Sequence, residues 1–141
     1  MSTRHGSIKA SNSALYREIE MLTLWLIGVG TRVPRGERML QVMAEQLMQT
    51  LMDAQAACAS ALLQSEPSAK LEYISALRLD MTLVQSTVKT WLEWSSQGGQ
   101  SVRILTPKQH VSFLRMMTSI GSQIHGWEVS LERRLGNKDP E

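Results

Sequence analysis

The sequence predicts an all-α protein, an antiparallel up-down-up-down bundle of four helices. Apolar residues recur at spacings of three and four along four segments, which is the spacing of one helix face. Breaks at Pro34, at 65–67 and at 97–100 separate the segments by short links. The last three segments are each about 30 residues, or about 45 Å, long. Helices of matched length joined by short links pack as antiparallel neighbours.

The first helix is predicted over 13–31. Ser13 is a suitable N-cap, because its hydroxyl can accept a hydrogen bond from a free N–H of the first turn. Pro34 ends the helix by pushing the residue before it out of the α region. The preceding residues, 1–12, are small and polar, and we expect them to form a disordered arm.

The second helix is predicted over 35–64, and it is poor in charge. Residues 39–66 contain no Lys or Arg and three acids. A helix with so few charged residues on any of its sides is poorly suited to contact with solvent. It therefore either lies deep in the bundle or also packs on another subunit. The second interpretation is favoured, because a four-helix domain cannot bury every side of one helix.

The third helix is predicted over 67–96, with Pro67 in its first turn. Its seam steps by three and four in the manner of a coiled coil. The seam residues are Ile74, Leu77, Met81, Val84, Val88 and Trp91. Gly98 and Gly99 end this helix.

The fourth helix starts strongly, with Thr106 as N-cap and Pro107 in the first helical position. It is expected to end near Leu135, with Gly136 as the stop signal. The folded domain is thus predicted over 13–135, and 136–141 form a flexible tail.

Two glycines, Gly121 and Gly126, interrupt the fourth helix. Each costs about 1 kcal/mol relative to alanine in a helix interior. The compensation predicted for them is the close approach of another helix.

Among the tryptophans, Trp91 and Trp127 are in register with the apolar seams and are predicted to be core residues. Trp94 is expected to cap the end of the bundle or to face a partner. The alternative is that Trp91 and Trp94 together stack on nucleic-acid bases.

The sequence contains no recognisable catalytic constellation, cofactor motif or metal motif, so we expect a protein that is not an enzyme. The single cysteine, Cys58, excludes an internal disulfide and falls on the apolar stripe of the second helix, which predicts a buried structural thiol. The longest apolar run, about 21–29, is too short to cross a bilayer. These features predict a soluble, cytoplasmic protein with no membrane partner.

Basic residues are the candidates for a partner site, although the formal net charge is only +2. They cluster at the first and third links, which share one end of an up-down bundle. Glu37 is the one acid among them. The six candidate nucleic-acid or protein contacts are Arg32, Arg35, Arg38, Arg103, Lys108 and Arg115. The alternative is an ordinary solvated, charged loop region.

Several short motifs occur in an order and placement that resemble one family. They are LTPKQH at 105–110, IGSQIHGW at 120–127, TRVPR at 31–35 and WLEW at 91–94. Together they resemble the accessory variability determinant proteins of diversity-generating retroelements, over about 14–135. Four-helix proteins encoded by intervening sequences in bacterial ribosomal RNA genes are broader relatives that share the bundle and a Gly-Trp ending.

The resemblance implies a barrel-shaped homopentamer of four-helix bundles. Such a protein binds the retroelement's reverse transcriptase and its template RNA, and possibly DNA, and supports mutagenic copying of the template into cDNA without chemistry of its own. Of the matched positions, Arg35 is a contact candidate. The matched structural positions are Pro34, Thr106, Pro107, Gly121, Gly126 and Trp127. The competing hypotheses are an oligomeric scaffold of the intervening-sequence type with a protein-only partner, and an enzyme with an unrecognised site.

Overall fold

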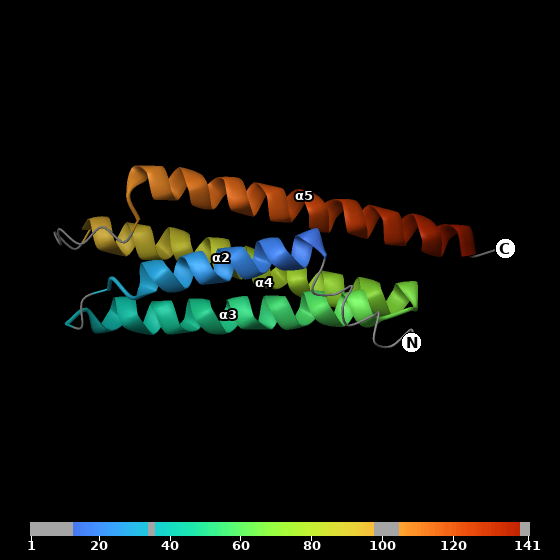
Figure 1. Cartoon of the computed structure of the whole chain (residues 1–141), viewed down its shortest axis with the longest axis horizontal. Helices are drawn as coiled ribbons and strands as arrows, with labels where there is room; N and C mark the ends of the chain where they lie inside the picture. The colour runs from blue at the N-terminus through green and yellow to red at the C-terminus, as the bar shows by residue number, and fades with distance from the viewer. Residues whose placement is uncertain (1–12, 34–35, 98–104, 139–141) are drawn as a thin grey trace.

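The computed structural model describes residues 13–33, 36–97 and 105–138. These residues form four α-helices and no strand: α2 (Ala14–Gly30), α3 (Arg38–Leu63), α4 (Pro67–Gln97) and α5 (Pro107–Lys138). The helices lie side by side along one long axis (Figure 1). The prediction of an all-helical fold with four helices is therefore confirmed.

The helices form a ring in which each contacts two neighbours: α2 packs on α3, α3 on α4, α4 on α5, and α5 on α2. In Figure 1 the end of α2, the start of α3, the end of α4 and the start of α5 all lie at the left. The short connection from α3 to α4 lies at the right. The two regions that carry the predicted basic residues are thereby brought to one end of the molecule.

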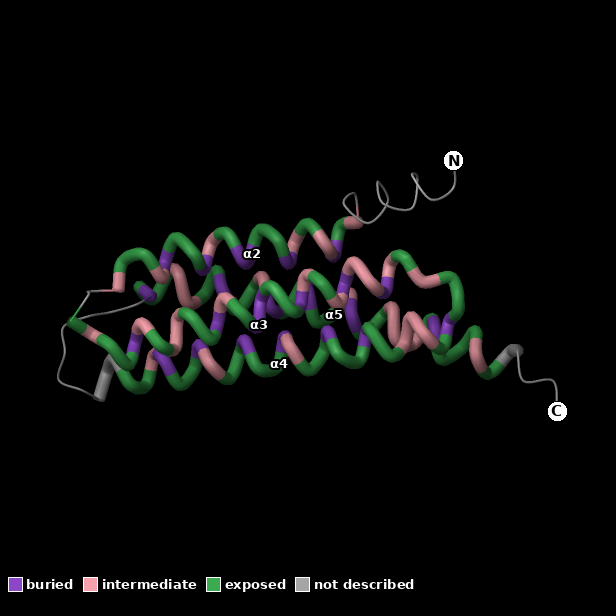
Figure 2. The backbone as a smooth tube through the Cα atoms, turned by 90° about the horizontal axis from the view of Figure 1, so that it is seen from below, coloured by how far each residue is buried: buried purple, intermediate pink, exposed green. Residues whose placement is uncertain are grey.

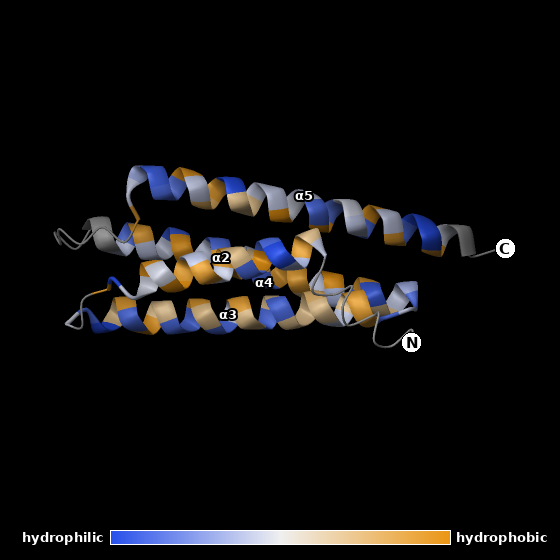
Figure 3. Cartoon of the chain, viewed as in Figure 1, coloured by the Kyte–Doolittle hydropathy of each residue, from blue (hydrophilic) through white to orange (hydrophobic). Residues whose placement is uncertain are grey.

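The core runs the length of the bundle and takes residues from all four helices. Buried positions recur along each helix at helical intervals (Figure 2). All six residues of the seam predicted for the third helix are buried in α4. Hydrophobic residues are denser on α2 and α3 than on α5 (Figure 3).

The caps predicted at two helix starts are present. The Ser13 hydroxyl accepts a hydrogen bond from the Tyr16 N–H at 3.4 Å. At the start of α5, the Thr106 hydroxyl accepts from the Gln109 N–H at 3.1 Å, and the Gln109 side chain accepts from the Thr106 N–H at 2.9 Å. This reciprocal pair is a capping box, which fixes where α5 begins.

Two helix boundaries differ from the prediction. The helix α3 begins at Arg38 rather than at 35, and Glu37, which precedes it, makes no side-chain cap hydrogen bond. The helix α5 continues through Gly136 to Lys138. A glycine stops a helix only when it adopts a left-handed conformation, and Gly136 has none here.

Polar contacts tie the helices together outside the core. The Glu18 carboxylate of α2 accepts hydrogen bonds from Ser119 and Gln123 of α5. The Arg78 guanidinium of α4 forms an ion pair with Glu128 of α5. These contacts fix α5 against both of its neighbours.

At the end of the bundle away from the basic residues, Lys70 joins three helices. Its ammonium donates to the Ala61 carbonyl of α3 at 3.0 Å and lies 5.8 Å from the centre of the Trp127 ring of α5. Because the last carbonyls of a helix lack partners within it, this bond also caps α3. Partial burial, followed by repulsion from Arg134, lowers the pKa of Lys70.

The close helix approach predicted at Gly121 and Gly126 is wrong within this chain. A Cβ atom built on either glycine meets nothing within 4 Å, and both residues are exposed. Gly121 faces a hollow between α5 and α4 and Gly126 is open to solvent, so neither Cβ position touches a neighbouring helix of the same chain.

Candidate functional site

The end of the bundle where α2 and α4 finish and α3 and α5 start carries the predicted basic residues, and we call it the basic end. Arg32 follows α2, Arg38 opens α3, Lys108 lies in the first turn of α5, and Arg115 lies about two turns further along. All four side chains are exposed. None of them forms an ion pair with another described residue. Two further predicted contacts, Arg35 and Arg103, and the matched residue Pro34 lie outside the described residues.

The basic end contains more acidic residues than the sequences of the two links predicted. Glu37 lies half-buried beside Arg38. Glu93, near the end of α4, and Glu45, two turns into α3, lie toward the same end. Both acids lie on the helices rather than in the links, so a prediction based on the links alone leaves them out. The basic excess there is therefore smaller than the links alone suggest.

The two tryptophans of α4 have different environments at this end. Trp91 is 1% exposed and belongs to the core, whereas Trp94 is 48% exposed. The pairing of Trp91 and Trp94 as base-stacking residues is therefore wrong, because Trp91 is buried and presents no ring surface to a nucleic acid. The indole of Trp94 is the aromatic surface that the described part of the basic end offers to a partner.

A strip of apolar residues, four of them exposed and one, Met48, half-buried, runs along the outer side of α2 and α3. Ile27 of α2 and Met48 of α3 line one hollow between these helices. Leu24 lies one turn before Ile27 on α2, and Met52 lies one turn after Met48 on α3. Each lies on the same side of its helix as that neighbour. Leu24 is 64% exposed and Met52 59% exposed. Met21 continues the strip by one more turn of α2, and we call these five residues the α2–α3 strip.

The sequence pattern predicted a contact surface on the α3 half of this strip alone. The low charge of the second helix predicted a subunit contact on α3, but no contact surface was predicted on the outer side of α2. A signal was present: Met21, Leu24 and Ile27 step by three beside the core stripe of the same helix. One helix that is apolar on two sides predicts a second packing partner.

Cys58 has the inert environment that its place in the sequence predicts. The side chain is fully buried on the core side of α3. Burial raises the pKa of its thiol to about 12. The thiolate is the nucleophilic form of cysteine, and it is not populated here near neutral pH.

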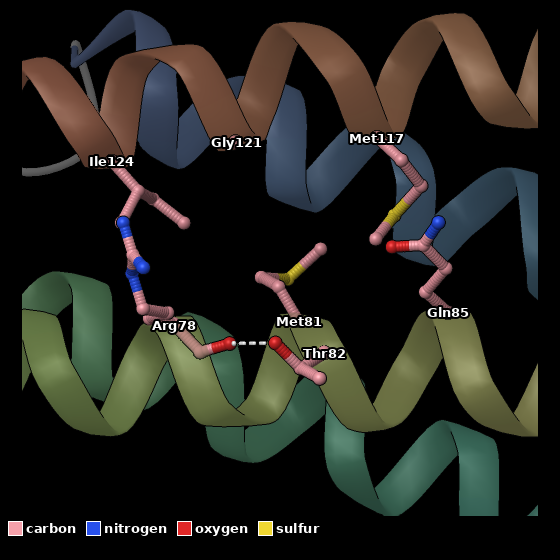
Figure 4. A pocket seen from close by; sticks show the side chains of 7 residues that line it. All are labelled: Arg78, Met81, Thr82, Gln85, Met117, Gly121 and Ile124. Atoms are coloured by element: carbon pink, nitrogen blue, oxygen red, sulfur yellow. Dashed lines mark hydrogen bonds between the residues drawn. The ribbon is translucent and has the colours of Figure 1, made fainter.

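A hollow of about 190 Å³ lies between α4 and α5, where the glycine at 121 leaves the α5 wall bare (Figure 4). Met81 reaches into it from α4 and Met117 from α5. The Thr82 hydroxyl is turned back onto its own helix, where it donates to the Arg78 carbonyl at 3.0 Å. The seven residues that line the hollow include no carboxylate, histidine or cysteine, and thus no pair able to act as nucleophile and base.

Within the described ranges, no group of three or more His, Cys, Asp or Glu side chains is placed to hold a metal ion. Among the same residues, no helix is both long enough and apolar enough to cross a membrane. Two surface features of the described residues suit macromolecular contact, the basic end and the α2–α3 strip.

Comparison with known proteins gives no relative: no family model, no curated protein and no solved structure matches this chain.

Proposed function

We propose that this protein is a non-enzymatic, oligomeric accessory protein of a diversity-generating retroelement. In this proposal it binds the element's reverse transcriptase and the template RNA, or the DNA copied from it, and so supports mutagenic cDNA synthesis. The observation that carries the nucleic-acid part is the gathering of Arg32, Arg38, Lys108 and Arg115, all exposed, at one end of the bundle.

The chemistry of the basic end suits a phosphate backbone. Arginine and lysine side chains that are exposed, and that form no ion pair with another described residue, can exchange their counterions for phosphates, which drives binding at low salt. Trp94 adds an exposed aromatic ring beside these charges. Stacking of bases on aromatic rings next to a positive surface is the usual way in which proteins hold single strands.

The oligomeric part of the proposal is supported by the α2–α3 strip. Large exposed apolar residues that are contiguous mark contact surfaces on otherwise soluble helical domains. We propose that this strip packs on a second copy of the chain in an up-down bundle assembly, for which the resemblance suggests five subunits. In such a ring each basic end repeats, so that the fields of the subunits add.

A second candidate function is an oligomeric scaffold of the ribosomal RNA intervening-sequence type that binds protein only. The acids Glu45 and Glu93 near the basic end favour it, since they reduce the positive field available to a nucleic acid. The two candidates differ in one measurable respect, which is RNA binding at physiological salt.

Two matched triple variants test the proposal. The first carries Arg38→Gln, Lys108→Gln and Arg115→Gln at the basic end. The control carries Arg17→Gln, Arg133→Gln and Arg134→Gln, which are exposed and lie toward the other end of the bundle. Both variants lose three positive charges, so any difference between them reports position rather than net charge.

Binding of a fluorescently labelled structured RNA is followed by anisotropy over a range of salt concentrations. The basic-end variant is expected to lose affinity, and the slope of log K against log salt is expected to fall by about 2, at roughly 0.7 per lost contact. The control is expected to retain the wild-type slope. Equal weakening of both variants would remove the basic end as the contact surface. An absence of RNA binding by the wild type at about 0.15 M salt would favour the protein-only scaffold.

A further inference from the structure

The hollow between α2 and α3 shares Ile27 and Met48 with the α2–α3 strip, and its floor contains a feature that packing of the strip on a second copy does not use. It has a volume of about 210 Å³ and lies at the end of the α2–α3 strip nearest the basic end. Leu26 and Trp91, both buried, form its floor, while Ile27 and Glu45 are exposed at its mouth. Trp91 comes from α4, so its ring crosses the interior of the bundle to reach the groove between two other helices.

The indole N–H of Trp91 is buried and has no hydrogen-bond acceptor within the described part of the chain. Buried polar groups are almost always paired, so an unpaired donor on a side chain that lines a hollow calls for a partner. A water molecule suits the place poorly, because buried waters make about three hydrogen bonds and this floor offers one donor among apolar side chains.

The walls define what an acceptor-bearing molecule must look like. Apart from Trp91, the side-chain donor among the lining residues is the Thr31 hydroxyl, and it already donates to the Gly28 carbonyl at 2.8 Å. The remaining floor is apolar, which penalises a buried charge, and the Glu45 carboxylate at the mouth repels an anion. An apolar cavity of about 150 Å³ in another protein holds one benzene molecule, so this hollow has room for one ring and a small substituent.

We propose that the hollow is a binding site for a small uncharged molecule with one aromatic ring and one carbonyl group, whose oxygen accepts the Trp91 N–H. Met48, at the edge of the hollow, has a flexible side chain that can adjust to the ring. This inference does not rest on RNA or reverse-transcriptase binding, and it requires that the hollow stays open when the strip packs on a second copy.

Acetophenone and ethylbenzene are the probes, because they have similar shapes and only acetophenone has an acceptor. The four tryptophans give four indole N–H signals in a ¹H–¹⁵N spectrum, and Trp91→Phe identifies the signal of Trp91. Acetophenone is expected to shift that signal downfield and saturably. Ethylbenzene is expected to bind about fivefold more weakly, the value of one ordinary hydrogen bond. In Trp91→Phe the two probes are expected to bind equally.

Two glycines of α2 provide a matched pair of variants. Gly30 lines the hollow, and a Cβ there would lie 3.8 Å from the Ala44 Cβ, so Gly30→Leu fills the space. Gly28 is exposed, with nothing within 4 Å of its Cβ position, so Gly28→Leu is the control. Gly30→Leu is expected to abolish binding of both probes, and Gly28→Leu to leave it unchanged.

Three results would overturn the proposal: no saturable shift of the Trp91 signal up to the solubility limit of acetophenone, equal affinity of the wild type for the two probes, or undiminished binding by Gly30→Leu. If Trp91→Phe fails to fold, the proposal is still tested in two ways. The two probes are compared on the wild type, and the two glycine variants are compared with each other.

Discussion

At the scale of the residue, Cys58 shows how burial controls chemistry in this bundle. Its thiol has a pKa of about 12 in the folded chain against 9.0 as the reference value. Between these pH values the unfolded chain loses the thiol proton and the folded chain keeps it. Stability supplied by the neutral thiol is therefore complete below pH 9 and is lost as the pH rises toward 12.

The corresponding prediction compares the wild type with Cys58→Ala. The free energy of unfolding, measured with urea at several pH values from 7 to about 10.5, is expected to fall more steeply in the wild type above pH 9. The extra slope is at most about 1.4 kcal/mol per pH unit. Parallel curves for the two proteins would contradict the buried, protonated thiol.

Single positions were predicted well where one physical rule decides them. Ser13 and Thr106 cap their helices because a hydroxyl placed just before the first turn can accept a hydrogen bond from a free N–H of that turn. The pairing of Trp91 with Trp94 failed because positions three apart on one helix share a face only approximately. The Trp91 ring points into the core and Trp94 lies at its edge, and this distinction depends on where the neighbouring helices lie.

At the scale of the element, α5 contains two glycines whose effect can be measured. Gly121 and Gly126 lie in the helix interior, are exposed, and have open space at their Cβ positions. Alanine at either position loses less backbone entropy on folding and meets no obstacle. Each substitution is expected to raise the free energy of unfolding by about 0.5–1 kcal/mol.

Chemical denaturation of Gly121→Ala and Gly126→Ala checks this prediction, with the mass in solution recorded for each variant. A lower stability together with a lower mass would show instead that a second copy packs closely on these glycines. That outcome would restore the close approach predicted from the sequence, but between subunits rather than within one chain.

The sequence predicted that four helices exist and placed most of their ends correctly, because periodicity and capping are local. Helix α3 and the end of α5 were the exceptions. A glycine signals a stop only when the backbone beyond it turns, and Gly136 continues in the helix. The backbone conformation after a glycine depends on the contacts that the following residues can make. A local sequence pattern does not contain this information.

At the scale of the whole molecule, the position of the basic end followed from the sequence and its surroundings did not. Helices of similar length with short links bring the first and third links together, so Arg38 and Lys108 were expected to share an end, and they do. The acids that accompany them, Glu45 two turns into α3 and Glu93 in the last turns of α4, lie on the helices and not in the links. A prediction based on the links alone therefore leaves both acids out.

The α2–α3 strip makes the last prediction, which concerns assembly. Leu24 and Met52 are more than half exposed in the single chain, so charged side chains there do not disturb its core. If the strip packs on a second copy, Leu24→Lys with Met52→Lys places two positive charges on each side of the contact. Burying an unpaired charge is strongly unfavourable, and the assembly is expected to dissociate.

Light scattering measures the outcome directly. The wild type is expected near 79 kDa, five times the chain mass of 15.8 kDa, and the double variant near the mass of one chain. Gln46→Lys is the control, because Gln46 is exposed on α3 but lies outside the strip and faces the groove toward α4. Far-ultraviolet circular dichroism confirms that each variant keeps its helices. A wild type that already has the mass of one chain would remove the assembly, whereas a double variant that keeps the full mass would move the interface to another face of the bundle.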